Sequence, residues 1–403
     1  MVKPIVKRRK PVLVTAISIV VGLMLASLFF IYPMYEANNK RSSIISPTDS
    51  ISLQPSSSLN TPPEKEDEIK KMMGQMDIDE KLGQMIMGGY DNIDKIQPII
   101  RENKLGGVIL FTKNIRSVSQ TIKETQGLKE SNLKNKIPLF ISIDQEGGRV
   151  SRLPSEVGTF ESALSIGKRD DPTYAFNSGV KTAKTLKKLG FNLDFAPVLD
   201  IASNPENTVI ADRAFGTTSD RVSKIGNQVL KGLRSESIIP TAKHFPGHGD
   251  TKMDSHVGLP VVNKSIAELK SFEFKPFIEA IKNEAEMIMI AHIKLSKVED
   301  LPSSLSYKVV TGILRQQLGF KGVIITDDMT MSAITQNYTI SEAAIKAVNA
   351  GCDIVLVAQG PQNSVLALNS LKSAYQDGKI TEQRIDESVY RILSLKKQYE
   401  LMD

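Results

Sequence analysis

Histidine and cysteine are scarce in this chain of 403 residues, which contains four histidines and one cysteine. The single cysteine, Cys352, excludes an intramolecular disulfide and a lipid-modified N-terminus, so a domain outside the cell must be held by its core alone. Three of the four histidines lie in one segment, KHFPGHGDTKMDSH (243–256), beside Asp250 and Asp254. This concentration of histidine indicates either a metal site or an acid–base site in that segment.

The excess of positive charge is confined to the N-terminus. The chain has 51 basic and 45 acidic residues, and residues 1–41 hold seven of the basic ones and one of the acidic ones, so the remaining 362 residues balance at 44 of each. A neutral body has no general attraction for phosphate backbones. This distribution of charge argues against a nucleic-acid-binding protein.

A long uncharged stretch follows the first basic residues. Residues 11–35 (PVLVTAISIVVGLMLASLFFIYPMY) contain no charged side chain, and about 20 apolar residues suffice to span a bilayer as a helix. The basic stub at 1–10 ends in KRRK, and the positive-inside rule places it in the cytoplasm. We therefore predict a single-pass anchor in the cell membrane, with the rest of the chain on the extracellular side.

A cleaved signal peptide is the alternative explanation of this stretch. The apolar region of a signal peptide is typically only about 7–15 residues long. The sequence after the stretch also offers no convincing small-x-small cleavage site, and Ala37 is a poor candidate. These features favour the uncleaved anchor.

The rest of the chain divides into a tether and one large domain. Residues 36–66 are rich in Ser, Pro and Asn and show no hydrophobic period, which is typical of a flexible linker. From 67 to 403, short apolar runs alternate with amphipathic stretches of helical length. The runs predict buried strands at 84–89, 106–111, 138–144, 191–197, 239–245, 286–292, 322–328 and 353–359. The amphipathic stretches predict helices at 93–104, 172–190, 219–237 and 307–319, and a closing helix at 382–401.

Eight strands that alternate with helices predict an α/β fold, a single (β/α)8 barrel of the TIM type. Glycines placed between a helix and the next strand are expected to be left-handed helix caps; they are Gly106, Gly190, Gly319 and Gly351. A doubly wound open sheet is the alternative, although no G-x-G-x-x-G follows the first strand.

Polar side chains gather where the predicted strands end. The active site of such a barrel lies at the carboxyl ends of its strands. The residues found there are Asp144, Asp200, Asp212, Arg213, Lys243, His244, His292, Asp327 and Asp328. Taken singly, Asp200, Asp212 and Asp328 are better explained as satisfied structural residues. Their joint position on one face nevertheless predicts an active site there.

A metal site in the histidine segment would have nitrogen and oxygen ligands from His244, His248, Asp250, Asp254 and His256. The spacing is not H-E-x-x-H, nor a common structural zinc pattern. Pro246, Gly247 and Gly249 prevent a helix that would bring two of the histidines to one face.

An acid–base site needs fewer residues and explains the spacing. Asp254 stands two residues before His256, so in an extended loop the two side chains point the same way and can hydrogen-bond. The carboxylate would fix the imidazole tautomer and stabilise its protonated form. A reaction with a covalent intermediate also needs a nucleophile, and Asp327, at a strand end, is a suitable carboxylate.

KHFPGHGDTKMDSH resembles the signature of glycoside hydrolase family 3, in its bacterial β-N-acetylglucosaminidase branch. Further segments resemble motifs of this family in the expected order: MDIDEKLGQM (76–85), LGGVILFTKNI (105–115), IDQEGGRVSRL (143–153), NLDFAPVLDI (192–201), RAFG (213–216) and GVIITDDMTM (322–331). The resemblance covers about residues 67–400 and implies a barrel.

The resemblance implies a role for each matching position. Asp327 matches the nucleophile of the family, His256 the acid/base of this branch, and Asp254 the partner of that histidine. The residues that match N-acetylglucosamine-binding positions are Asp144, Arg152, Arg213, Lys243 and His244. His248 is expected to serve loop structure, and His292 either supports the floor of the pocket or packs in the core.

The resemblance implies a retaining exo-β-N-acetylglucosaminidase that works by double displacement and needs no cofactor or metal. Outside the membrane, we expect it to remove terminal, non-reducing GlcNAc from peptidoglycan fragments carrying GlcNAc-β-1,4-MurNAc in cell-wall turnover, as a monomer. Three alternatives stay open. In the first, an acid/base without negative charge admits phosphate as the acceptor, and the enzyme is a phosphorylase. In the second, the chain is an inactive anchored sugar-binding protein. In the third, it is a metal-dependent hydrolase.

Overall fold

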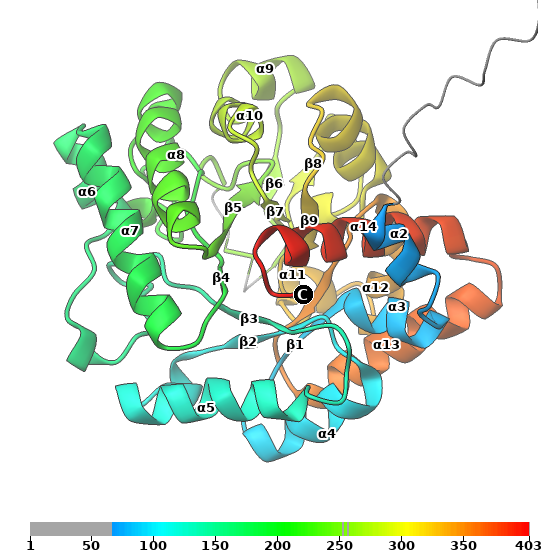
Figure 1. The fold of residues 1–403 in the computed structure, drawn as a ribbon. Coiled ribbons are helices and arrows are strands. Elements are labelled where there is room, and N and C mark those ends of the chain that lie inside the picture. The colour runs from blue at the N-terminus through cyan, green and yellow to red at the C-terminus, as the bar shows by residue number, and fades with distance from the viewer. Residues whose placement is uncertain (1–66, 252–253, 256–257, 403) are drawn as a thin grey trace, which may run out of the picture. The chain divides into compact units, whose positions relative to one another are not determined.

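Eight parallel strands form the centre of the fold. The computed structural model of the chain describes residues 67–251, 254–255 and 258–402, all within one unit, Lys65–Asp403. The strands are hydrogen-bonded in the order β10-β1-β2-β3-β4-β5-β7-β9 (Figure 1). Their bounds are β1 (Ile86–Gly89), β2 (Gly107–Leu110), β3 (Phe140–Ile143), β4 (Leu193–Asp194), β5 (Ile239–Phe245), β7 (Met287–Ile290), β9 (Val323–Thr326) and β10 (Val355–Val357). Each lies within one of the eight predicted apolar runs.

The sheet closes between its first and last strands. Ile325 in β9 pairs in parallel with Ile354, which directly precedes β10. The Thr326 N–H donates to the Ile354 carbonyl at 3.1 Å, and beyond the strand the Met329 N–H donates to the Leu356 carbonyl at 2.9 Å. A closed ring excludes the open doubly wound sheet and confirms the predicted barrel.

Helices surround the ring of strands (Figure 1). The longer ones are α4 (Ile93–Asn103), α5 (Val118–Ser131), α7 (Pro172–Lys188), α8 (Ser219–Ser235), α10 (Lys275–Lys282), the π-helical segment η5 (Lys308–Gln317), α12 (Ile340–Ala350), α13 (Pro361–Gln376) and α14 (Glu382–Gln398). The shorter ones are α2 (Glu68–Met73), α3 (Ile78–Gln84), α6 (Ala163–Arg169), α9 (Ile266–Ser271) and α11 (Ser332–Thr335), with single 3-10 turns at Thr112–Asn114, Ser155–Val157, Ala211–Arg213 and Ser303–Leu305. All five predicted helices are present.

Local sequence signals fix the helix ends. Asp171 caps α7 by accepting from the N–H groups of its first turn, and Pro172 occupies the first helical position, where no N–H is needed. Gly190, Gly319 and Gly351 have positive φ as predicted. The prediction for Gly106 was wrong, because Lys104, with φ of 51°, caps α4 instead. A Cβ at Gly106 would collide with the carbonyl oxygen of Gln84, so this glycine serves close packing.

The end of the barrel where the strands begin is closed by α14. Its Lys396 is buried and donates to the Gln84 side chain and to the carbonyls of Gly106 and Pro138, at 2.6–2.9 Å. These acceptors precede β1, β2 and β3. The opposite end of the barrel, where the strands finish, is therefore the end at which a substrate site can form.

A two-stranded parallel ribbon, β6 (Val261–Val262) with β8 (Lys294–Leu295), adds to the barrel. The sequence did not predict it, because two-residue strands carry no detectable period.

The predicted stub, anchor and tether at 1–10, 11–35 and 36–66 lie outside the described residues. Across 67–251, 254–255 and 258–402, every helix is too short or too polar to cross a bilayer.

Candidate active site

A pocket of about 270 Å³ lies at the carboxyl ends of the strands. Its polar walls come from β5 and from the segments that follow β3, β4, β5 and β9. Six residues predicted from the sequence line it: Asp144, Arg152, Arg213, Lys243, His244 and Asp327. The structure thus brings together side chains that lie up to 183 positions apart in the chain.

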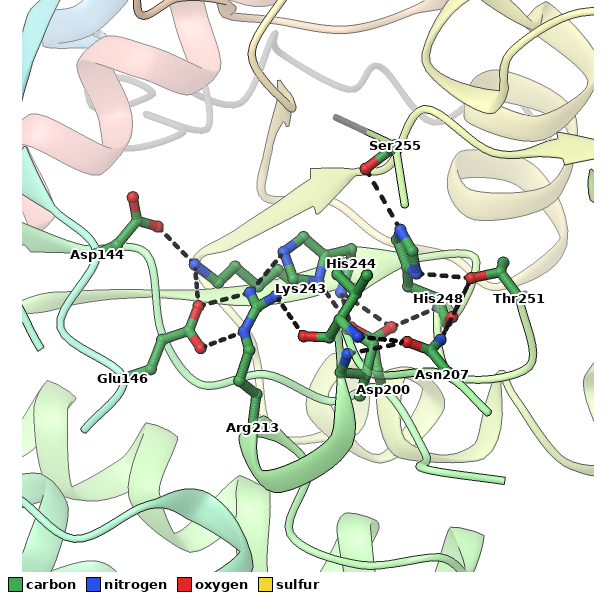
Figure 2. Close-up of polar contacts among 12 residues, drawn as sticks. Asp144, Glu146, Asp200, Asn207, Arg213, Lys243, His244, His248, Thr251 and Ser255 are labelled. Carbon is green, nitrogen blue, oxygen red and sulfur yellow. Dashed lines mark hydrogen bonds and ion pairs between the residues drawn. The ribbon is translucent and has the colours of Figure 1, made fainter. Parts of the chain in front are cut away.

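The ammonium group of Lys243, on β5, lies between two carboxylates. Its Nζ is 2.6 Å from Oδ1 of Asp144 and 2.8 Å from Oε1 of Glu146, and only 2 % of the side chain is exposed (Figure 2). Burial by itself would lower the pKa of Lys243, but the two carboxylates raise it above its usual value. Lys243 is therefore a fixed cation, and one of its three N–H groups is left for a ligand.

Glu146 also binds Arg213 through two parallel contacts. Nε of Arg213 is 2.7 Å from Oε2, and Nη2 is 2.8 Å from Oε1. Burial by itself would raise the pKa of Glu146, but Lys243 and Arg213 together hold it well below its usual range. Glu146 stands two residues after Asp144 in IDQEGG and was not predicted as a site residue. The motif itself was the signal, but the pairing with a residue 67 positions away is visible only in three dimensions.

Asp200, after β4, is buried beneath His244. Its Oδ2 lies 2.7 Å from Nδ1 of His244, and its Oδ1 accepts from the N–H of His248 at 2.6 Å (Figure 2). Burial by itself would raise the pKa of Asp200, but the two histidines hold it below its usual value. Because Asp200 is a carboxylate, we assign the proton of His244 to Nδ1, and Nε2 then faces Nη2 of Arg213 at 3.5 Å.

Asp327 directly follows β9 and faces the pocket. Its N–H donates to the Ile290 carbonyl at 2.9 Å, and its Oδ1 accepts from the N–H of Asp328 at 2.8 Å. Burial by itself would raise its pKa, but His292, His244, the Asp328 N–H and Lys243 lower it below the usual value. The side chain is therefore ionised and able to act as a nucleophile.

Asp328 has the opposite environment. Its carboxylate is hydrogen-bonded to the hydroxyl and N–H of Thr330 and to the N–H of Ala358, at 2.5–2.9 Å. Burial raises its pKa. These contacts agree with the structural role expected for Asp328, whose side chain also lines the pocket. Asp212 has the same kind of role, since it pairs with Arg149 at 2.8 Å.

His292 is fully buried and does not belong to the pocket wall. Its Nε2 lies 2.9 Å from the Asp328 carbonyl oxygen, and its Nδ1 lies 2.7 Å from the Ser304 hydroxyl. His292 therefore contacts the backbone of the segment that carries Asp327 and supports it from outside the pocket wall.

Arg152 offers a donor to the pocket. Its backbone N–H donates to the Gln145 side chain at 2.9 Å, whereas its buried Nε has no hydrogen-bond partner among the described residues. A buried N–H without a partner costs free energy, which a ligand oxygen at this place would recover.

The predicted acid–base pair lies in a segment that the structure describes only in part. Asp254 is described, and its carbonyl accepts from the Gly258 N–H at 3.1 Å. His256 lies outside the described residues. Ser255, between them, lines the pocket and is 3 % exposed, although the sequence analysis gave it no role.

Two of the residues considered as metal ligands make other contacts in the described part of the chain. Asp250 pairs with Lys264 at 2.9 Å, and His244 is held by Asp200. Within that part, no group of three or more His, Cys, Asp or Glu side chains is arranged to hold a metal ion.

Comparisons with known proteins agree on one family. The family model described as the glycosyl hydrolase family 3 N-terminal domain matches residues 77–395. The chain is 34 % identical over 327 residues to beta-hexosaminidase A of Pseudoalteromonas piscicida, which covers 75 % of this chain and 55 % of that protein. It is 31 % identical over 322 residues to the beta-hexosaminidase of Hydrogenovibrio crunogenus, covering 76 % and 88 %.

A solved structure agrees with these relatives. The glycoside hydrolase family 3 beta-N-acetylglucosaminidase from Paenibacillus sp. str. FPU-7 superimposes with a TM-score of 0.79 at 38 % identity, covering 81 % of this chain and 63 % of that one. The chain thus spans about half of the Pseudoalteromonas protein and less than two thirds of the Paenibacillus chain. By sequence, barrel and pocket, this protein belongs to glycoside hydrolase family 3.

Proposed function

We propose that this protein is a retaining exo-β-N-acetylglucosaminidase. The observation that carries the proposal is the position of the Asp327 carboxylate at the end of β9, in a pocket whose other walls present Lys243, Arg213 and Arg152 as donors. Fixed cations and N–H donors bind sugar hydroxyl and acetamido oxygens, and a carboxylate such as Asp144 accepts from hydroxyl groups. The names of the two beta-hexosaminidase relatives and of the Paenibacillus enzyme support the same sugar.

In the proposed reaction, Asp327 attacks the anomeric carbon and forms a glycosyl-enzyme while His256 gives a proton to the leaving oxygen. Water then attacks the same carbon, His256 takes the proton back, and Asp327 is released. Asp254 would orient His256 and stabilise its protonated form. The pair of carboxylates common in glycosidases is here replaced by one carboxylate and an Asp–His dyad.

The proposed substrates are peptidoglycan fragments that end in GlcNAc-β-1,4-MurNAc. This part of the proposal rests on residues 11–35, which would anchor the chain in the cell membrane with the barrel outside, next to wall material. Protease treatment of intact protoplasts tests it: the barrel should be degraded while cytoplasmic proteins survive. A protected barrel would contradict the extracellular location.

The activity test uses the full chain and 4-nitrophenyl β-N-acetylglucosaminide, with and without EDTA and with and without phosphate. Asp327→Ala should lose nearly all activity, and added azide should restore turnover and give the α-glycosyl azide, because azide replaces the missing nucleophile. Asp220→Asn is the matched control, since that carboxylate is 92 % exposed and lies outside the pocket.

Each other outcome points to an alternative. A rate that requires phosphate and yields a sugar 1-phosphate would replace hydrolysis by phosphorolysis. Loss of activity with EDTA would favour a metal-dependent hydrolase. An inactive wild type that still binds GlcNAc would make the chain a binding protein.

A further inference from the structure

His248 connects two parts of the pocket wall, although the proposed mechanism gives it no task. Its side chain lies between two hydroxyl groups: Nδ1 is 3.0 Å from Oγ1 of Thr251, and Nε2 is 3.4 Å from Oγ of Ser255 (Figure 2). The residue is 3 % exposed. Through Nε2, His248 thus contacts Ser255, which lies in the same loop and directly precedes His256.

The backbone of His248 is held to the barrel. Its N–H donates to Asp200 at 2.6 Å, and its carbonyl accepts from Nδ2 of Asn207 at 2.8 Å. Asp200 is the same carboxylate that holds His244. The imidazole of His248 therefore projects from a fixed point, and its orientation is set by the floor of the site.

Ser255 is held from a second side. Its carbonyl accepts from the N–H of Ala333 in α11 at 3.1 Å. Helix α11 follows the segment that begins with Asp327, so Ser255 is tied to the part of the chain that carries the proposed nucleophile. Its hydroxyl and carbonyl, in the residue that precedes His256, thus contact two different elements of the barrel.

We propose that His248 is a positioning residue, which through Ser255 sets the place of the neighbouring His256 relative to Asp327. The inference rests on the proposed acid/base role of His256. The contact joins the floor of the sugar site to the start of the acid/base dyad. The placement of His256 as proton donor then depends on Asp200, the same carboxylate that orients His244.

The protonation state of His248 suits this role. Burial lowers its pKa, which the charge of Asp200 opposes only in part. A neutral imidazole has one donor and one acceptor nitrogen, so each nitrogen can be matched by one of the two hydroxyl groups. A protonated imidazole would lose the acceptor.

The test compares two leaving groups in the full chain. A general acid contributes about 10²–10⁴-fold when the leaving group needs a proton, but little when it leaves readily as an anion. We therefore measure kcat/KM for N,N′-diacetylchitobiose and for the 2,4-dinitrophenyl glycoside. In Ser255→Ala and His248→Asn, we expect a loss of about tenfold or more on chitobiose and less than about threefold on the dinitrophenyl glycoside.

Two further variants sharpen the comparison. The amide of His248→Gln reaches the place of Nε2 and retains the contact with Ser255, whereas the shorter amide of His248→Asn reaches only the place of Nδ1. Gln should therefore restore most of the chitobiose activity. Ser142→Ala is the control for loss of a buried hydroxyl, because Ser142 lies in β3 and donates to the Val108 carbonyl at 2.9 Å; it should affect both substrates equally.

The outcomes separate this inference from the proposed function. His256→Ala is the reference and should lose activity only on chitobiose. If it loses both substrates equally, the acid/base assignment falls and the positioning role falls with it. If His256→Ala discriminates but Ser255→Ala and His248→Asn weaken both substrates equally, His248 is merely structural and only this inference is overturned.

Discussion

The imidazole of His244 and the carboxylate of Asp200 are joined by a 2.7 Å contact between Nδ1 and Oδ2, with 8 % and 0 % of their side chains exposed. The contact fixes which nitrogen of His244 carries the proton. The other oxygen of Asp200 holds the backbone of His248. One buried carboxylate therefore holds both His244, which we propose to bind the sugar, and the loop that leads to the proposed acid/base.

Asp200→Asn should impair catalysis more than folding. The amide keeps the shape of the carboxylate, but its NH2 group can donate to Nδ1 of His244 only if the imidazole proton moves to Nε2, which then faces the Arg213 guanidinium as a second donor. A buried polar group left without a partner costs about 1–3 kcal/mol. We expect kcat/KM on a β-N-acetylglucosaminide to fall by about 10–100-fold, measured beside the exposed control Asp220→Asn. Wild-type kinetics in Asp200→Asn would contradict the orienting role.

Glu146→Gln should destabilise the site itself. Lys243 and Arg213 would then lie close together in the buried pocket wall with one carboxylate fewer to balance their charge. Removing one partner of a buried ion pair costs about 3–5 kcal/mol. We expect a loss of this size in urea unfolding at pH 7, together with reduced kcat/KM. Glu161→Gln is the control, because its pair with Arg169 is 40 % and 51 % exposed and contributes no more than about 1 kcal/mol.

The pH dependence of this effect has a defined sign. The pKa of Glu146 is depressed in the fold, so its stabilising contribution is present above the ordinary pKa of a glutamate and is lost as the pH falls. The stability difference between wild type and Glu146→Gln should stay constant from pH 7 to about pH 5 and shrink as the pH falls from about 5 to about 3, below the ordinary glutamate pKa. A constant difference over this range would show that packing, not charge, explains the loss.

Asp353→Asn should affect folding and leave the chemistry alone. Asp353 is buried just before β10 and pairs with Arg315, and with Arg384 and Arg391 at 3.2 and 3.0 Å. This cluster ties α14 to the end of the barrel opposite the pocket. We expect a loss of about 3–5 kcal/mol in unfolding free energy but unchanged kcat/KM for the fraction that remains folded. A change in kcat/KM at full folding would mean that the two ends of the barrel are coupled.

Periodicity determines how much of the fold the sequence predicts. MIMI in β7 is apolar at every position, and VIIT in β9 is buried throughout and apolar except for Thr326, as expected of strands buried on both faces. The cap at Gly106 was mispredicted, because a glycine between helix and strand has the same appearance whether it turns the chain or lets two backbones approach. Only the contact with Gln84 distinguishes the two cases.

The site was predictable where a strand end places the side chain. Asp144 and Asp327 directly follow strands and Lys243 lies in the last half of β5, and all three line the pocket. Glu146 and Asp200 were given no functional role, because their importance lies in partners 44–97 positions away rather than in their own position. The role of His256 stays a prediction.

The last residue of β4, Asp194, is a fully buried acid whose pKa the fold raises. One carboxyl oxygen accepts from the Gln145 N–H at 2.9 Å, and the other has no hydrogen-bond partner among the described residues. Burial raises its pKa well above the usual value; Asp144 and Glu146 add to the shift, and the Gln145 N–H and Lys243 oppose it only in part. At neutral pH the unfolded chain releases this proton, whereas the folded protein with its raised pKa retains it more strongly. The free energy of unfolding is therefore lower at neutral pH than at acidic pH.

Asp194→Asn should therefore stabilise the protein at neutral pH. The amide has the shape of the neutral acid and keeps the acceptor for Gln145, but it needs no proton. Because the folded pKa is raised, the stability of the wild type is complete below the ordinary aspartate pKa and declines as the pH rises above it. We expect the Tm of Asp194→Asn to exceed that of wild type by several degrees at pH 7.5 and to match it near pH 4, while Asp220→Asn shows no such trend. An equal or lower Tm at pH 7.5 would show that Asp194 is ionised in the fold, and its unpartnered oxygen would then need a cation or water to satisfy it.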